Sequence, residues 1–393
     1  MTKLARALAL GVASGLLFSA AALADDFHGF DPAKYDGTRL SADQYKAMVT
    51  DAMAVKPPRN GKKYVIGFAN LQRDMTFGVV VEKSIQANAD LAGVDLLVAD
   101  NRLDGPTALA NAQSFVQRNV DYVIEFQTDS NFGQTVMNVF NEDGTKVVAI
   151  DIPMPGATFF GANNPKSGYM SGSYLGQAAI AKFGKDKAMT GYFVVGELPQ
   201  SGAIPKMRTE GQVNGFLSAL PDFDKSKMLR IDTKNTLQES FTQMSNVLSR
   251  IPDGVPIMVT AINDQSAIGM LRAVKQAGRE ADVVVVGNGA DETKALVDEP
   301  QLYGATGYFP ETYGNYLIPI ALSSLAGKPL PPAVLVSHVM INKANVCKYY
   351  PDYKCSDKAE FDYVFPQAAF EAYLAELRKE PFLKGFEDLV PAN

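Results

Sequence analysis

Runs of apolar residues alternate with amphipathic segments through most of the 393-residue chain. Short runs rich in valine and isoleucine predict strands buried on both faces, and apolar residues at three- and four-residue spacing predict helices between them. In the first half, strands are predicted at 63–69, 94–99, 122–126 and 146–150. The helices between and after them are predicted at 77–91, 106–116 and 132–140. This alternation is typical of a parallel, doubly wound α/β sheet.

The same pattern starts again after residue 159. Strands are predicted at 190–195, 227–231, 257–260 and 282–286, with helices at 167–183, 206–220, 237–248 and 266–277. The chain therefore contains two consecutive α/β halves of similar plan. A last set comprises a strand at 302–308, a helix at 313–325 and a strand at 334–341. It is too small for a third core, so we expect it to cross back and complete both sheets.

The first residues have the features of a secretory signal. Lys3 and Arg6 precede an apolar stretch at 8–22, and Ala22-Leu23-Ala24 forms a cleavage signature. The alternative, a membrane anchor, needs a longer apolar core. We therefore predict cleavage after Ala24, leaving residues 1–24 as a signal peptide, and export of the mature protein. Residues 25–61 are a polar N-terminal extension that could hold one helix at 42–54.

Composition and missing motifs argue against several functions. The chain is 47% hydrophobic and 20% charged with a formal net charge of -6, which is typical of a globular protein and unfavourable for nucleic-acid binding. The chain has no tryptophan and only two histidines, and so few histidines argue against a histidine-based metal site or catalytic triad. Gly287-Asn288-Gly289 lacks the third glycine of a dinucleotide fingerprint. Paired carboxylates such as Asp74 and Asp151 are compatible with a glycoside hydrolase as an alternative. We predict instead that the protein is not an enzyme and needs no cofactor or metal.

The two cysteines, Cys347 and Cys355, lie close together in a tyrosine-rich segment. In an exported protein such a pair indicates a disulfide that closes a short loop. A metal site built on the pair would need further ligands, and His338 is the candidate nearest in sequence. We predict the disulfide and assign residues 344–393 to a tail that also holds a helix at 367–377.

Polar and aromatic side chains gather where predicted strands end. Because ligands of open α/β sheets bind beyond the carboxyl ends of the strands, these residues are candidate ligand contacts. They are Asn70, Phe77, Gln127 and Asp151 in the first half, and Asn263, Asp264, Asn288 and Asp291 in the second. Each carboxylate or amide could instead cap the helix that follows it. Amides, carboxylates and rings that converge on one point suit a polyhydroxylated ligand, since carboxylates and amides pair with vicinal hydroxyls and rings cover C–H faces.

The segment 261–278 reads Ala-Ile-Asn-Asp-Gln-Ser-Ala-Ile-Gly-Met-Leu-Arg-Ala-Val-Lys-Gln-Ala-Gly. This pattern resembles type I periplasmic substrate-binding proteins of ABC transporters, in the ribose- and galactose-binding branch. The resemblance covers roughly residues 62–341. It implies two doubly wound lobes joined by a three-stranded hinge, with the ligand in the cleft between them. The expected crossings lie near 162–163, near Tyr308 and near 331–332.

The resemblance also implies domain boundaries and roles for particular residues. One lobe would comprise 62–162 and 308–331, and the other 163–307 and 332–343. Asp151 and Asn263 match positions that bond sugar hydroxyls, Phe77 matches a stacking ring, and Tyr308 matches the polar hinge position. The chain departs from the family pattern where Ile152 follows Asp151. It also departs where Arg208, which we include among the candidate ligand contacts, lies one helical turn before the usual arginine. An aspartate of the family is displaced, which leaves Asn288 or Asp291 in its place.

Two functions are compatible with these features. The first is a monomeric binding protein that captures a sugar or related polyol and delivers it to the permease subunits of an ABC transporter. The second is a periplasmic sensor subunit that a chemoreceptor or histidine kinase reads in its closed form. A cytosolic repressor core would carry a DNA-binding helix pair and no export signal. The sequence does not identify the solute.

Overall fold

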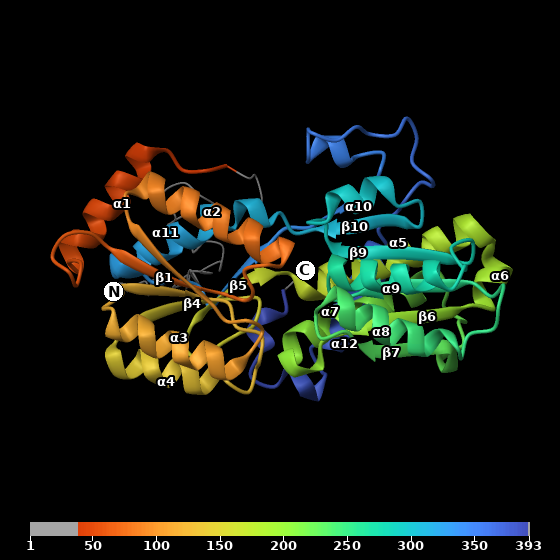
Figure 1. Cartoon of the computed structure of the whole chain (residues 1–393), viewed down its shortest axis with the longest axis horizontal. Coiled ribbons are helices and arrows are strands. Elements are labelled where there is room, and N and C mark those ends of the chain that lie inside the picture. The colour runs from red at the N-terminus through yellow and green to blue at the C-terminus, as the bar shows by residue number, and fades with distance from the viewer. Residues whose placement is uncertain (1–37, 392–393) are drawn as a thin grey trace, which may run out of the picture.

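The computed structural model describes residues 38–391 and shows two lobes side by side (Figure 1). Each lobe contains a six-stranded sheet with helices on both faces. The predicted signal peptide 1–24, its cleavage site and the first part of the N-terminal extension lie outside the described residues. Among the described residues, every helix is too short or too polar to cross a bilayer.

The N-terminal lobe has an entirely parallel sheet with the strand order β11-β5-β4-β3-β1-β2. Its strands are β1 (Val65–Asn70), β2 (Asp95–Asp100), β3 (Tyr122–Glu125), β4 (Lys146–Ile150), β5 (Thr158–Ala162) and β11 (Ala333–Val336). One face packs on α2 (Thr76–Ala92), α11 (Tyr313–Leu325) and α1 (Ala42–Val55). The other packs on α3 (Gly105–Gln117) and α4 (Gly133–Asp143). Both faces are buried, as the unbroken apolar strand runs require.

Helix α1 of the N-terminal extension is part of this lobe. Its first turn is closed by a capping box, in which Ser41 and Gln44 each bond the other's backbone N–H. Tyr45, Met48 and Ala52 are buried on the side that faces α11. The extension therefore contributes apolar core to the N-terminal lobe.

The C-terminal lobe has the strand order β12-β10-β9-β8-β6-β7, and only the edge strand β12 is antiparallel among the described residues. The strands are β6 (Tyr192–Glu197), β7 (Met228–Asp232), β8 (Ile257–Ala261), β9 (Val283–Gly289), β10 (Leu302–Gly307) and β12 (Val339–Ile341). The covering helices are α5 (Asn164–Phe183), α6 (Lys185–Met189), α7 (Ala203–Ala219), α8 (Leu237–Leu248), α9 (Asp264–Gln276) and α10 (Thr293–Asp298).

Helices α5 and α7 approach each other through glycines. A Cβ atom on Gly168 would lie 1.9 Å from the carbonyl oxygen of Arg208, and one on Gly172 would lie 2.0 Å from that of Gln212. Only glycine fits at such a backbone contact. The small residues predicted in helix 167–183 thus fix the position of α7, and with it the position of Arg208.

The chain crosses between the lobes three times, and the third crossing differs from the prediction. The first two follow β5 and β10. The predicted single strand 334–341 is in fact two strands, since β11 pairs with β5 of the N-terminal lobe and β12 pairs with β10 of the C-terminal lobe. The crossing therefore lies at 337–338 rather than at 331–332, and residues 332–336 belong with the N-terminal lobe. The segments on both sides of Ser337-His338 are apolar, so the pattern does not reveal a change of sheet.

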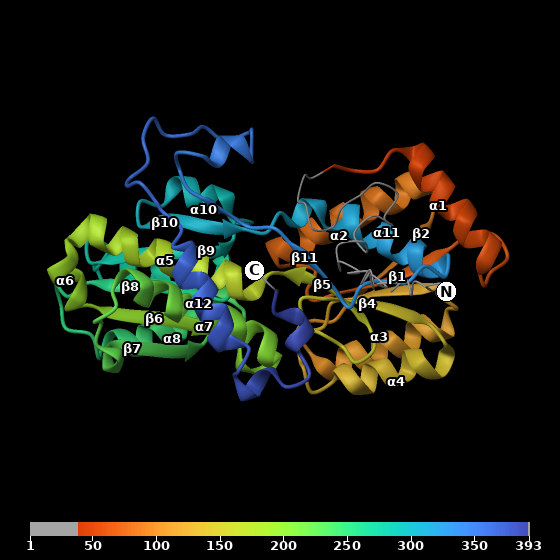
Figure 2. The ribbon, with the colours of Figure 1, turned by 180° about the vertical axis from the view of Figure 1, so that it is seen from behind.

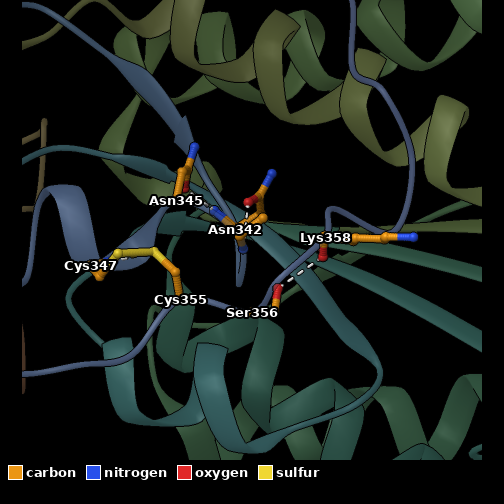
Figure 3. Close-up of a disulfide and its surroundings, with 7 residues drawn as sticks. Asn342, Asn345, Cys347, Cys355, Ser356 and Lys358 are labelled. Atoms are coloured by element: carbon orange, nitrogen blue, oxygen red, sulfur yellow. Dashed lines mark hydrogen bonds between the residues drawn. A yellow bond between two sulfur atoms is a disulfide. The ribbon is translucent and has the colours of Figure 1, made fainter.

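The C-terminal tail contacts both lobes. A disulfide joins Cys347 and Cys355 in the loop after β12 (Figure 3). The chain then returns along α5, and α12 (Gln367–Leu377) packs against α5 and α7. Beyond it, η6 (Pro381–Leu383) and η7 (Glu387–Leu389) lead toward the other lobe (Figure 2). Leu389 and Val390 lie in one apolar cluster with Phe159 of β5 and Ile204 of α7.

Candidate functional site

A cavity lies between the two lobes, where the carboxyl ends of both sheets face each other. Six of the ten predicted ligand contacts line it, namely Phe77, Asp151, Arg208, Asn263, Asn288 and Tyr308. The remaining lining residues are Leu71, Met75, Phe126, Thr128, Ile152, Leu198, Pro205, Asn235 and Ile262.

Asp151 follows β4 and brings a carboxylate to the N-terminal side of the cavity. Its backbone is left-handed, with φ of 56°. Oδ1 accepts a hydrogen bond from the backbone N–H of Ala162 at 3.0 Å, and no described residue donates to Oδ2. Gly161 leaves the space for this carboxylate, because a Cβ there would lie 2.3 Å from Oδ1. Burial raises the pKa of Asp151 above its usual value, and the positive charge of Arg208 partly opposes that rise.

Arg208 brings the opposite charge from the C-terminal lobe. The side chain is 7% exposed, and two hydrogen bonds fix its guanidinium. Nε donates to Oδ1 of Asn164 at 2.9 Å, and Nη1 donates to the carbonyl of Ile262 at 2.7 Å. Its Cζ lies 5.0 Å from the centre of the Tyr308 ring, within cation–π range. These partners hold the charged group in place before any ligand arrives.

Three asparagines form the floor of the C-terminal side. Asn263 caps α9, since its Oδ1 accepts from the backbone N–H of Ser266 at 2.8 Å. Its Nδ2 donates to Oδ1 of Asn235 at 2.9 Å. The alternative role of Asn263 as a helix cap is therefore also present in the structure. Asn288 donates to the carbonyl of Ala261 at 3.0 Å, while its buried Oδ1 has no partner among the described residues and is left to accept a bond from a ligand.

Aromatic rings border the cavity from both sides. Phe77 makes edge contacts with Phe126 and Tyr313, at centroid distances of 6.2 and 5.7 Å. Tyr308 donates from its hydroxyl to Oγ of Ser167 at 3.0 Å. Burial raises the pKa of Tyr308 to about 12, so the hydroxyl stays protonated at neutral pH.

Four predicted contacts do not line the cavity, namely Asn70, Gln127, Asp264 and Asp291. Asn70 is fully buried and donates to the carbonyl of Gly78 at 2.9 Å and to Oε2 of Glu82 at 3.0 Å. Gln127 accepts from the backbone N–H of Asp129 at 2.8 Å, which shapes its own loop. Both side chains therefore have partners within the N-terminal lobe, while the buried Oδ1 of Asn70 and Nε2 of Gln127 have none among the described residues.

Asp264 and Asp291 form a carboxyl pair beneath the cavity. Asp264 accepts from the backbone N–H of Glu292 at 3.3 Å and is 2% exposed. Burial raises the pKa of Asp264 to about 7. Burial and the neighbouring Asp264 raise the pKa of Asp291 well above its usual value. The bond from Glu292 to Asp264 supports the turn after β9.

The residues missed by sequence reasoning are mostly apolar neighbours of those predicted. Phe126, Ile152 and Ile262 each adjoin a predicted position in the chain. Asn235 was missed because it lies in the loop after β7, where Lys234 and Asn235 both have positive φ. The sequence signal for this loop position was an asparagine directly before Thr236, the N-cap of α8, because asparagine adopts positive φ more readily than most residues. Among residues 38–391, no group of three His, Cys, Asp or Glu side chains could hold a metal ion.

Two α/β lobes with a cavity between their strand ends are an architecture that solute-binding proteins use. Comparison with known families agrees: residues 66–329 match the periplasmic binding protein domain, and the chain belongs to this family. The ribose import binding protein RbsB of Bacillus subtilis is 23% identical over 295 residues, which cover 72% of this chain and 91% of that protein. A putative rhizopine-binding protein of Rhizobium meliloti is 26% identical over 319 residues, covering 77% and 98%.

A solved structure shares the fold. It is an ABC transporter solute-binding protein of Bacillus halodurans with bound myo-inositol, which superposes with a TM-score of 0.61 at 20% identity and covers 74% of this chain and 98% of that one. The matched proteins named here are binding proteins and not enzymes, in agreement with the prediction from sequence.

Proposed function

We propose that this protein captures a small polyhydroxylated molecule, a sugar or a cyclic polyol, and delivers it to the permease of an ABC transporter. The observation that carries the proposal is the pair Asp151 and Arg208, which line one cavity from opposite lobes. A carboxylate accepts from hydroxyl groups and a guanidinium donates to hydroxyl or ring oxygens, so a single polyol bonds both lobes. The relatives named for ribose and rhizopine, and the neighbour with bound myo-inositol, support this class of ligand.

Closure of the lobes around the ligand is part of the proposal. The lobes already touch in the structure through Ser130, whose N–H and Oγ both lie within hydrogen-bond distance of the carbonyl of Gln200, at 3.2 and 3.0 Å. Ser201 donates to the carbonyl of Thr128 beside it. These contacts support a closed arrangement. A ligand that bonds both lobes favours this state over an open one by its differential affinity, and the permease would read the closed form.

The disulfide and the family agree with an exported protein, and export through a cleaved signal peptide is part of the same proposal. The mature chain would begin at Asp25. N-terminal sequencing of periplasmic protein tests this, and an intact Met1 in the membrane fraction would contradict it.

Calorimetry with D-ribose, D-allose and myo-inositol tests the binding function. We expect one of these probes to bind and Asp151→Asn to weaken it at least about tenfold, because a charge-assisted hydrogen bond contributes about 1.5–3 kcal/mol. The amide keeps an acceptor for Ala162, so the fold should persist. Asp74→Asn, the same change at an exposed residue of the loop after β1, is the matched control.

Arg208→Lys tests the other wall of the cavity, with exposed Arg272→Lys as its control. Lysine cannot reproduce two bonds in fixed directions, so affinity should fall by a similar factor. Unchanged affinity in both Asp151→Asn and Arg208→Lys, or no binding of any sugar or polyol by the wild type, would contradict the proposed site. Loss of uptake of the bound solute in cells lacking the gene tests the link to transport.

A further inference from the structure

The two walls of the cavity differ in chemistry. The wall from the N-terminal lobe is mainly apolar and consists of Leu71, Met75, Phe77, Phe126 and Ile152 around Thr128 and Asp151. The wall from the C-terminal lobe contains the polar residues Arg208, Asn235, Asn263 and Asn288 beside Leu198, Pro205 and Ile262. A ligand that lies between the walls meets one carboxylate and one hydroxyl group on the N-terminal side, and three amides and a guanidinium on the C-terminal side.

Several polar residues near the strand ends of the N-terminal lobe bond one another, and they do not line the cavity. Arg73 holds Glu82 with two bonds of 2.9 and 2.6 Å, and the same carboxylate accepts from Asn70. At the next strands, Nδ2 of Asn101 donates to Oε1 of Glu125 at 2.8 Å, and both side chains are buried. The buried Oδ1 of Asn70, Oε2 of Glu125 and Nε2 of Gln127 have no partner among the described residues, but these three residues lie outside the lining of the cavity, which leaves this wall mainly apolar.

The C-terminal wall keeps unused bonding capacity. Nε and Nη1 of Arg208 donate hydrogen bonds within the C-terminal lobe, and no described residue accepts from Nη2. The buried Oδ1 of Asn288 has no partner among the described residues. Unsatisfied buried donors and acceptors are costly, so this wall favours hydroxyl groups.

The charges of the cavity limit the ligand further. Among the described residues, Asp151 and Arg208 are the only charged ones that line the cavity, and their charges are opposite. A ligand with a net charge would leave that charge uncompensated against an apolar wall, which is strongly unfavourable. The site therefore suits a neutral molecule.

We infer that the ligand is an amphipathic neutral polyol, such as a deoxy sugar or one carrying a methyl group, and this inference rests on the proposed function. Its apolar edge lies against Leu71, Met75, Phe126 and Ile152, and its vicinal hydroxyls face the C-terminal wall and Asp151. A hydroxymethyl group in place of the methyl would bury a hydroxyl with no partner on the apolar wall. That change should weaken binding by about 10- to 100-fold, from lost apolar burial and an unsatisfied hydroxyl.

Matched sugar pairs test the inference on the wild-type protein. The pairs are L-fucose with L-galactose, D-fucose with D-galactose, and L-rhamnose with L-mannose, each differing only by a 6-hydroxyl, and affinities are measured by calorimetry. We expect the tightest binder to be a deoxy sugar, with its parent at least about tenfold weaker. A parent that binds as tightly as its deoxy partner, or a charged probe such as D-galactonate that binds more tightly than the neutral sugars, overturns the inference and leaves the proposed function standing. If none of these sugars binds and ribose, allose and myo-inositol also fail, the proposed function fails as well.

Met75→Gln tests the position of the apolar edge. Glutamine matches methionine in length and offers a hydrogen-bonding group from the N-terminal wall. The preference for the deoxy member should fall to less than about threefold, because the extra hydroxyl gains a partner. The matched control is Met53→Gln on the outer helix α1, where the methionine is 38% exposed. A preference that stays the same in Met75→Gln overturns the assignment of the apolar edge to this wall.

Discussion

The backbone N–H of Asn163 donates a hydrogen bond to Nε2 of His338 at 2.9 Å, and this bond joins the first connection between the lobes to the third. The other ring nitrogen, Nδ1, lies 3.0 Å from the carbonyl oxygen of Gly307, just before the second connection. A neutral imidazole with its proton on Nδ1 satisfies both contacts. One side chain thus ties together all three connections of the hinge, and burial lowers its pKa to about 3, which keeps it neutral.

Replacement of His338 should destabilise the hinge and change its response to acid. His338→Phe keeps a ring beside Tyr308 but leaves two backbone groups unpaired, so the free energy of unfolding should fall by about 1–3 kcal/mol for each group. The folded-state pKa lies below the unfolded value, so the stabilisation is complete above about pH 6.5 and is lost as the pH falls toward 3. Urea unfolding at pH 7 and pH 4.5 should show a smaller acid-induced loss in the variant. Equal losses in the two proteins would contradict this role.

Glu125 should make the protein less stable at alkaline pH. This buried carboxyl at the end of β3 has its pKa raised to about 8 by burial, against the opposing hydrogen bond from Asn101. Since the folded pKa is raised, the stabilisation is full below about pH 4.3 and is lost as the pH rises through about 8. The loss can reach about 1.4 kcal/mol per pH unit in that window.

Glu125→Gln is a neutral mimic of the protonated acid and should remove that dependence. We expect its stability to fall less than that of the wild type between pH 5.5 and pH 8, as measured by urea unfolding. Glu142→Gln, on the exposed side of α4, is the control and should follow the wild type. A steep decline retained by Glu125→Gln would assign the pH dependence to other groups.

Gly168→Ala should disrupt both the fold and the site. The new methyl group would lie 1.9 Å from the carbonyl oxygen of Arg208, so α5 and α7 must separate. A backbone contact of this kind cannot be relieved by a side-chain rotation, and we expect a loss of about 2–4 kcal/mol in thermal or urea unfolding. Gly133→Ala is the matched control, since its nearest neighbour would be 3.7 Å away. Similar stability in the two variants would show that the helices tolerate separation.

The disulfide should stabilise the tail loop without affecting the cavity. Replacing Cys347 and Cys355 by serine opens a loop whose ends are separated by 8 in sequence, which should cost about 2–3 kcal/mol by the chain-entropy argument. Neither residue lines the cavity, so ligand affinity should be unchanged. Mass spectrometry of periplasmic protein measures the bond directly. Two free thiols there would contradict the expected pairing.

The strand–helix alternation was enough to predict two doubly wound lobes, because burial on both faces leaves a strong apolar signal. It also located the loops that surround the cavity. It could not show which way a side chain at a strand end turns. Asn70 and Asp264 turn into their own lobes, while Asp151 and Asn288 face the cavity, and all four have the same kind of position in sequence.

The third hinge connection shows a related limit. A strand's apolar pattern indicates burial but not the sheet to which it belongs, and β11 and β12 pair with different sheets across two residues. The sheet that each strand joins is decided by its pairing partner, which lies far away in the chain: β5 for β11 and β10 for β12. Similarly, Phe126 and Asn235 became visible as lining residues only when the two lobes were placed against each other.

The last residues of the described chain have a consequence for how occupancy could be observed. Leu389 and Val390 are buried in a cluster that includes side chains of both lobes, so separation of the lobes must also expose them to water. Cavity occupation and tail docking are then linked equilibria, and each favours the other by the same free energy. The amide hydrogens of the segment 381–391 should therefore exchange more slowly with solvent when the cavity is filled. Hydrogen exchange in this segment would then report the occupancy of a cavity that residues 381–391 do not line.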